Sequence, residues 1–180
     1  YYPATRNQCK EFIIGYDRDK EEAMFVTGYL YNPGDHPYKI PENVEELIKE
    51  CERELEQMAS PRAMWKEYPL SIQDHVLDMG FLQTKSKSLE RNLRDCERVI
   101  LFAATLGSRV DVLLHRYNMI QMSKAVVMQA ASVAMLETFC DEKNQELKSS
   151  YEAKGWYLRP RFSPGYGDFP LECQREIAPA

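Results

Sequence analysis

The apolar run from Val99 to Leu106 constrains the fold of this chain most strongly. The run reads Val-Ile-Leu-Phe-Ala-Ala-Thr-Leu and lies between Arg98 and Gly107. A strand without alternation between apolar and polar residues is typical of a strand that is buried on both faces. We therefore predict that this run is the central strand of a sheet.

Helical patterns lie on both sides of the run. Apolar residues recur at helical spacing from Glu42 to Ala59, and Ser60-Pro61 ends that pattern because the residue before a proline is disfavoured in a helix. Ser86 opens a second helix, since its hydroxyl can cap free amide groups. Further helices are expected over residues 109–117, from Ser123 to about Lys154, and after Pro170. Within the long helix, residues 125–135 are almost wholly apolar and are expected to be buried all round, whereas residues 141–152 are polar and are expected to lie along the surface.

Three other segments favour strands. They are Glu11 to Tyr16, Met24 to Tyr31, and the short extended pieces between Trp65 and Leu82, and a loop is expected over residues 32–37. Strands and helices in this order predict a mixed α+β or α/β domain. Residues 1–59 form an N-terminal part with strands and an amphipathic helix, residues 60–180 form the core, and we expect one compact domain overall.

Charge and composition exclude several classes of protein. The net charge is -5 with basic and acidic residues interspersed, so no positive stripe is available for nucleic acid. No apolar run reaches the roughly 20 residues that cross a bilayer, so we expect no membrane insertion. Five cysteines without close pairs favour reduced thiols in a cytoplasm, and Cys51, Cys96 and Cys140 fall on apolar helical positions as small core residues.

The segment Arg159-Pro-Arg-Phe-Ser-Pro-Gly-Tyr-Gly-Asp-Phe-Pro170 is the strongest candidate for a ligand site. Its three prolines make it stiff, and Gly165 and Gly167 allow positive φ angles and a close approach of another group to the backbone. Arg161 on such a loop is suited to an anionic small molecule, because a guanidinium binds a carboxylate through two parallel hydrogen bonds. The alternative is a structural crossover whose arginines pair with surface carboxylates. The residues alone leave both interpretations open.

Other polar residues give weaker signals. Thr105, Gly107 and Asp111 follow the apolar run, where they could either face a ligand or cap the next helix. His36, His75 and His115 have no neighbouring ligands at metal spacing, so no metal site is predicted.

Two stretches resemble the activation domain of cobalamin-dependent methionine synthase, in its stand-alone bacterial form. The first matches that family's arginine-x-x-proline-glycine-tyrosine signature at Arg161, Pro164, Gly165, Tyr166 and Pro170. The second comprises the segments Ser86 to Leu93, Cys96 to Gly107, Val110-Asp111, and Met122 through Asp141. The resemblance covers about two thirds of the chain, from Ser60 to Ala180, and implies an α+β fold in which a long buried helix packs on a mainly antiparallel sheet.

The resemblance also implies a function. Such a domain binds S-adenosylmethionine and caps the cobalamin held by methionine synthase. An electron donor such as a flavodoxin then supports reductive methylation of the cobalamin. By this resemblance, the protein would be a component of a methyltransferase in methionine biosynthesis. By resemblance, Arg161 holds the ligand carboxylate, and Pro164, Gly165, Tyr166 and Gly167 shape the pocket. Glu137 or Asp141 is a candidate for the ligand's ammonium group. No catalytic acid or base is expected, because the redox chemistry belongs to the cofactor.

Three hypotheses follow. The first is this S-adenosylmethionine-binding accessory protein. The second is a non-enzymatic module that docks on a corrinoid protein and no longer binds S-adenosylmethionine. The third is an unrelated ligand-binding domain that shares only the loop, which a surface salt bridge at Arg161 would favour. Further strands follow the loop in the family. Three alternatives are therefore expected here: the missing part is disordered or cleaved, the strand-like segments between Glu11 and Tyr31 replace it, or the S-adenosylmethionine site is incomplete.

Overall fold

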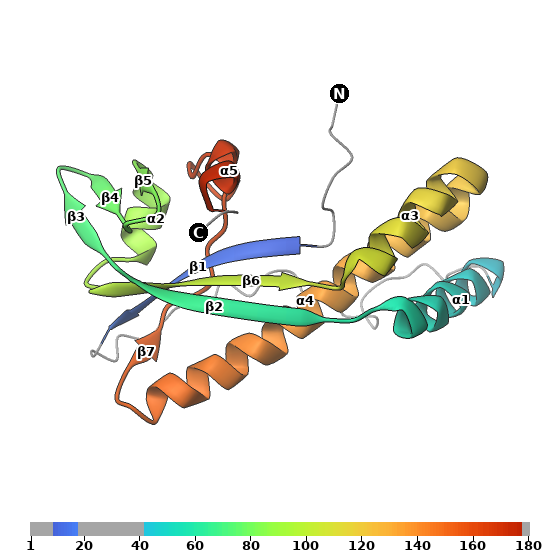
Figure 1. Cartoon of the computed structure of the whole chain (residues 1–180), viewed down its shortest axis with the longest axis horizontal. Coiled ribbons are helices and arrows are strands. Elements are labelled where there is room, and N and C mark those ends of the chain that lie inside the picture. The colour runs from blue at the N-terminus through green and yellow to red at the C-terminus, as the bar shows by residue number, and fades with distance from the viewer. Residues whose placement is uncertain (1–8, 18–41, 178–180) are drawn as a thin grey trace. The chain divides into compact units, whose positions relative to one another are not determined.

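The computed structural model describes residues 9–17 and 42–177, and its elements are drawn in Figure 1. These residues form two compact units. A helical unit comprises residues 42–62 and 105–139, and a sheet unit comprises residues 10–17, 63–104 and 140–177. The α+β class, with antiparallel sheets and one long helix, is confirmed. The second expected strand, Met24 to Tyr31, and the expected loop over residues 32–37 lie outside the described residues, and the division of the chain at residue 60 stays a prediction.

The sheet unit is built on a four-stranded sheet with the order β2-β6-β1-β7. Its strands are β1 (Cys9–Asp17), β2 (Arg62–Pro69), β6 (Arg98–Thr105) and β7 (Tyr157–Leu158). Strand β6 has a neighbour on each side, and Val99 to Phe102 are buried. The predicted central strand is therefore confirmed, and β1 confirms the strand predicted over Glu11 to Tyr16.

A smaller antiparallel sheet belongs to the same unit. It consists of β3 (Ser71–Gln73), β4 (Val76–Asp78) and β5 (Gln83–Thr84), in that order. The β3–β4 connection has two residues, Asp74 and His75, whose φ angles are 50° and 61°. Two positive φ angles in a two-residue loop fit the right-handed twist of a hairpin. Strands β3 and β4 confirm the short strands predicted between Trp65 and Leu82, and β5 lies just beyond that range.

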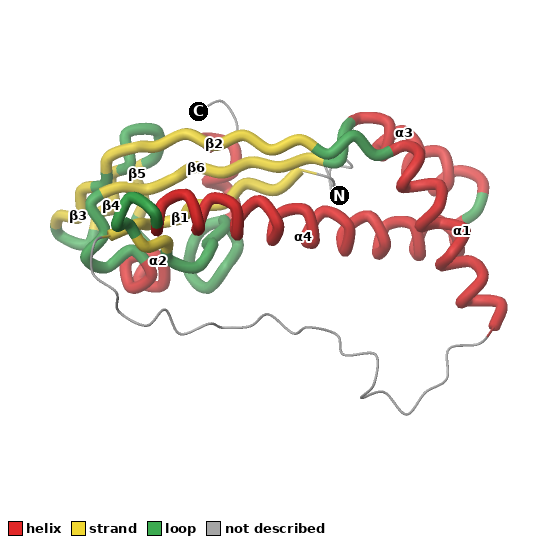
Figure 2. The backbone as a smooth tube through the Cα atoms, turned by 90° about the horizontal axis from the view of Figure 1, so that it is seen from below, coloured by secondary structure: helices red, strands yellow, loops and turns green. Residues whose placement is uncertain are grey.

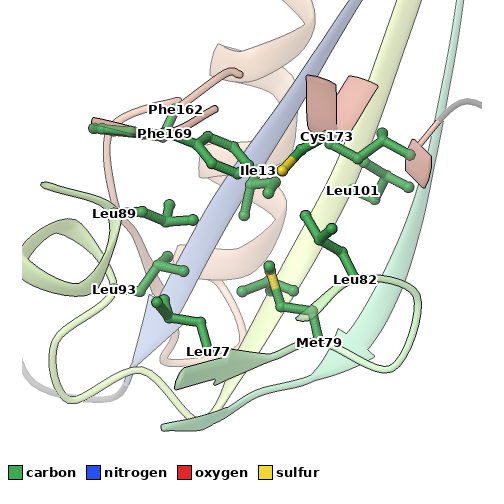
Figure 3. Close-up of a cluster of buried hydrophobic side chains, with 12 residues drawn as sticks. Ile13, Leu77, Met79, Leu82, Leu89, Leu93, Leu101, Phe162, Phe169 and Cys173 are labelled. Carbon is green, nitrogen blue, oxygen red and sulfur yellow. The ribbon is translucent and has the colours of Figure 1, made fainter. Parts of the chain in front are cut away.

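One face of the large sheet carries the hydrophobic core shown in Figure 3. Ile13 on β1 and Leu101 on β6 meet side chains from the small sheet, from α2 (Lys87–Asn92), and from the C-terminal segment with η1 (Leu171–Cys173) and α5 (Gln174–Ile177). Phe162 and Phe169 also join this core, with ring centroids 6.3 Å apart. The loop that sequence analysis singled out is therefore anchored in the core through its two phenylalanines.

The other face of the sheet is packed by the C-terminal part of α4 (Met122–Glu152), which Figure 2 shows running along the strands of the sheet unit. Cys140, Leu147 and Tyr151 are its buried residues there, and the Tyr151 hydroxyl donates a hydrogen bond to Glu67 on β2. Gly155, with φ of 79°, ends the helix. The amides of Gly155 and Trp156 bond to the carbonyls of Glu152 and Tyr151, which is the Schellman pattern of a helix end. The predicted packing of a long helix on an antiparallel sheet is confirmed.

The helical unit contains α1 (Glu42–Met58), α3 (Ser108–Ile120) and the first part of α4. Helix α1 buries Cys51 and Leu55, and α3 buries Val110, Leu113, Leu114 and Tyr117. Cys51, Cys96 and Cys140 are all buried, as predicted from their apolar positions.

Lys124 on α4 is the buried charge of the helical unit, and the sequence analysis did not single it out. Its ammonium group lies 2.7 Å from carboxylate oxygens of both Glu50 and Glu54 on α1, and 4.5 Å from the ring centroid of Tyr117 on α3. Burial lowers the pKa of Lys124, but the two carboxylates outweigh burial and raise its pKa above the ordinary value. Tyr117 also donates a 2.7 Å hydrogen bond to Glu54. This network links the three helices through one ammonium group that two carboxylates share.

One expectation for α4 is wrong. Residues 125–135 are not buried all round, because Val126, Ala130 and Ala134 are exposed, as is Met122 at the start of the helix. An apolar run predicts that a helix has a buried side, but it does not show which of its other sides the rest of the chain leaves exposed. Among residues 9–17 and 42–177, no helix is long and apolar enough to cross a membrane.

Candidate functional site

The backbone of the candidate loop begins as an extension of the large sheet. Strand β7 pairs with the end of β1, where Leu158 lies opposite Tyr16. The chain then continues along β1: the Arg159 amide bonds to the Gly15 carbonyl at 2.7 Å, and Phe162 and Ile13 exchange two hydrogen bonds of 2.9 and 2.7 Å. Arg161 therefore lies on an extended segment whose position is fixed by main-chain hydrogen bonds on both sides of it.

Arg161 points away from the phenylalanine core, as strand alternation requires, because its neighbour Phe162 points into the core. Its Nη2 atom lies 2.6 Å from Oδ1 of Asp141 on α4. The arginine side chain is 17% exposed and the aspartate side chain is 67% exposed. The guanidinium is thus largely enclosed, and the carboxylate that it meets is open to water.

After Arg161 the chain folds into a compact turn. The Tyr166 amide bonds to the Ser163 carbonyl, the Gly165 amide to the Phe169 carbonyl, and the Phe169 amide to the Tyr166 carbonyl, at 3.1, 2.8 and 3.0 Å. Gly165 has a φ angle of 90°, a conformation that side chains with a Cβ rarely adopt. Pro164 is buried, whereas Tyr166 is 60% exposed. The Tyr166 ring packs edge-on against the Phe162 ring, with ring centroids 5.5 Å apart.

Asp168 fixes this turn to the start of α2. Its carboxylate accepts hydrogen bonds from the Ser86 hydroxyl at 2.6 Å, the Lys87 amide at 2.8 Å and the Ser88 amide at 3.0 Å. The hydrogen bond from Ser86, together with those from the two amides, holds the pKa of Asp168 well below its ordinary value. Ser86 also accepts a bond from the Leu89 amide at 3.1 Å, so the cap predicted at Ser86 is confirmed.

Gly167 is required by a close approach within the chain itself. Its φ angle is 59°, and a Cβ placed on it would lie 2.7 Å from Oγ and 2.9 Å from Cβ of Ser88. The sequence predicted a close backbone approach at this glycine, and the group that approaches is Ser88 of this chain. This anchor of Asp168 and Ser88 was not predicted from the sequence, although two serines at a helix start and an aspartate after a glycine are the residue types that such an anchor uses.

The other candidate residues lie in the helical unit. Glu137 is half-buried on α4, and its proposed role beside a ligand stays a prediction. Gly107 is the N-cap of α3 with a φ angle of 93°, and its amide bonds to the Thr105 hydroxyl at 3.0 Å. Gly107 thus occupies the N-cap position of α3 without a side-chain cap bond, and whether Thr105 and Gly107 also face a ligand stays a prediction. Burial raises the pKa of Asp111 on the same helix.

Two of the three histidines, His75 and His115, lie within the described residues. His75 lies 3.1 Å from the Glu90 carboxylate, His115 is exposed on α3, and His36 lies outside the described residues. Within the described ranges, no three histidine, cysteine, aspartate or glutamate side chains lie close enough to hold a metal ion.

Arg161 and Asp141 are the predicted residues that the structure brings together, whereas the Pro164–Gly167 turn that follows Arg161 in the chain is held against Phe162 and the start of α2. A largely enclosed guanidinium beside an open carboxylate presents a positive and a negative group within hydrogen-bond distance of each other. This pair is complementary to the two charged ends of an amino acid.

A scan of the chain against protein-family models finds no match, and no curated protein matches it either.

Proposed function

We propose that this protein binds S-adenosylmethionine and assists the reductive methylation of cobalamin held by methionine synthase, in the cytoplasm and together with an electron donor such as a flavodoxin. The proposal comes from the resemblance at Arg161, Pro164, Gly165 and Tyr166. The observation that supports it best is the placement of Arg161 beside Asp141, on a segment that main-chain hydrogen bonds hold along β1.

The charges fit the methionine end of this ligand. Arg161 would bind the α-carboxylate, and Asp141, whose side chain is largely exposed, would accept a hydrogen bond from the α-ammonium group. Glu137 is the other candidate for the ammonium group. S-adenosylmethionine supplies the methyl group, and the residues of this chain bind and orient it.

The same ion pair also supports the competing hypotheses. Arg161 is paired with a largely exposed carboxylate, which is the surface salt bridge that favours the third hypothesis, an unrelated ligand-binding domain that shares only the loop. A corrinoid-protein docking module without S-adenosylmethionine is also compatible with this pair, and binding measurements separate these candidates from the first.

Calorimetric titration with S-adenosylmethionine tests the proposal, alone and with the cobalamin-loaded synthase. We expect Arg161→Ala to weaken binding by more than about 1.5 kcal/mol, roughly tenfold or more, which is the scale of a charge-assisted hydrogen bond. Arg159→Ala is the matched control, because Arg159 lies on the same segment and its guanidinium donates to the Arg94 carbonyl at 3.3 Å. That variant should bind as the unaltered chain does.

Two outcomes would count against the proposal. Absence of S-adenosylmethionine binding with the corrinoid partner present contradicts it. Pull-down of a corrinoid protein with equal yield by the unaltered chain and Arg161→Ala would favour the docking module instead.

A further inference from the structure

An apolar surface on the helical unit is independent of the loop site and of the proposed function. It consists of Met119 and Ile120 at the end of α3 and Met122, Val126, Ala130 and Ala134 on α4, and we refer to it as the α3–α4 face. The four larger side chains are 64–75% exposed. Patches of large exposed apolar residues usually mark a surface that another molecule covers.

The exposed side of α4 lacks charge over more than four turns. Its exposed positions between residues 122 and 138 are Met122, Ser123, Val126, Ala130, Ala134 and Thr138. A helix face that meets water ordinarily carries charged residues. The one cation of this stretch, Lys124, is buried in its pairs with Glu50 and Glu54. The α4 side of this face therefore offers no accessible cation to a nucleic acid or an anionic membrane.

The spacing of the face makes it complementary to itself. Met122, Val126, Ala130, Ala134 and Thr138 follow one another at intervals of four residues, which places them on one ridge of the helix. If two copies of this ridge cross antiparallel with Ala130 at the centre, Val126 of one copy lies opposite Ala134 of the other. In the same register Met122 lies opposite Thr138, so larger side chains meet smaller ones on both sides of the centre.

We propose that the α3–α4 face is the interface of a two-fold homodimer in which the α4 helices of two copies cross at Ala130. Two surfaces without charge meet without like-charge repulsion and without burying an unpaired ion. Ridges of four-residue spacing pack at about −50°, and alanine at the crossing allows the axes to approach to about 8 Å. Closed two-fold dimers are also the commonest homo-oligomers.

Sedimentation velocity on the whole chain, over a concentration series, tests this proposal. The unaltered chain should sediment as a monomer–dimer equilibrium. Ala130→Glu and Ala130→Lys each place two like charges at the crossing, and each should raise the dimer dissociation constant by roughly 100-fold. Gln145→Glu, an exposed position on the same helix outside the face, is the matched control and should leave the constant unchanged.

A mixture of the two Ala130 variants gives the decisive result. Opposite charges then meet at the crossing, so the mixture should recover the dimer that neither variant forms alone. Because Ala130 is exposed, both variants should retain the circular dichroism spectrum of the unaltered chain. A monomeric unaltered chain, dimers that resist both substitutions, or a mixture that stays monomeric would each overturn the proposal. The face would belong to another occupant if the monomer bound phosphatidylcholine vesicles or a corrinoid protein and Ala130→Glu abolished that binding. Either result would also overturn the dimer proposal.

Discussion

Substitution of Gly167 by alanine is the sharpest test of how the candidate loop is held. The residue has a φ angle of 59°, and the new Cβ would lie 2.7 and 2.9 Å from two atoms of Ser88. The left-handed conformation costs an L-residue about 1–2 kcal/mol, and overpacking against Ser88 adds about 1–3 kcal/mol. We therefore expect Gly167→Ala to lower the free energy of unfolding by about 2–5 kcal/mol.

Gly80→Ala is the matched control for this substitution. Gly80 has a φ angle of 79° in the same unit, but a Cβ there meets nothing within 4 Å. It should show the conformational cost alone, about 1–2 kcal/mol. The difference between the two variants isolates the contact with Ser88.

Urea denaturation followed by tryptophan fluorescence measures this difference. The chain has two tryptophans, Trp65 and Trp156, and both lie in the sheet unit that contains the loop. With a denaturant slope of about 2 kcal/mol per molar, a 2 kcal/mol difference separates the midpoints by about 1 M. Adding Ser88→Gly should recover part of the loss in Gly167→Ala, with a coupling energy that a double-mutant cycle reports. Equal destabilisation by Gly167→Ala and Gly80→Ala would refute the reasoning.

Two further predictions concern charges held in fixed hydrogen bonds. Because the pKa of Asp168 is lower in the folded protein than in the unfolded chain, its contribution to stability is present above the unfolded pKa and is lost as pH falls through the folded pKa. Asp168→Asn should therefore flatten the fall of the urea midpoint between neutral and strongly acidic pH. An acid profile identical to that of the unaltered chain would contradict this prediction. Glu54→Ala removes one of the two carboxylates that pair with the buried Lys124, and it should lower the free energy of unfolding by about 1.5–3 kcal/mol because Glu50 remains as a partner. Glu56→Ala, an exposed control on the same helix, should change the free energy of unfolding by less than about 0.5 kcal/mol in the same urea titration. A loss at Glu54 no larger than at Glu56 would show that Lys124 does not depend on this pair.

The elements that sequence predicted best are those with a local signal. The apolar run at Val99 showed a strand buried on both faces, and it is the inner strand β6. Ser86 showed a helix start, and its hydroxyl caps the Leu89 amide. In each case the residues that produce the structure are adjacent in the chain, so their pattern is visible without the fold.

The candidate site was predicted less completely, because its contacts join residues that are distant in sequence. Arg161 was singled out and Asp141 was one of two candidates, but their 2.6 Å approach follows from the packing of α4 beside the loop in the sheet unit. Asp168 meets Ser86 across 82 positions, and no spacing rule connects them. Glu137 had the same sequence support as Asp141, and its role stays a prediction.

The sequence by itself determined the class of the fold, the central strand, the main helices and the stiffness of the loop, since each depends on propensities and periodicities along a few turns or strand positions. Only the tertiary structure decided that the glycine of the loop makes room for Ser88, that Asp168 anchors the turn to α2, and that one apolar side of α4 is left uncovered. The physical reason is that the amino-acid pattern records which groups avoid water or need a hydrogen-bond partner, whereas packing in three dimensions decides which group meets that need.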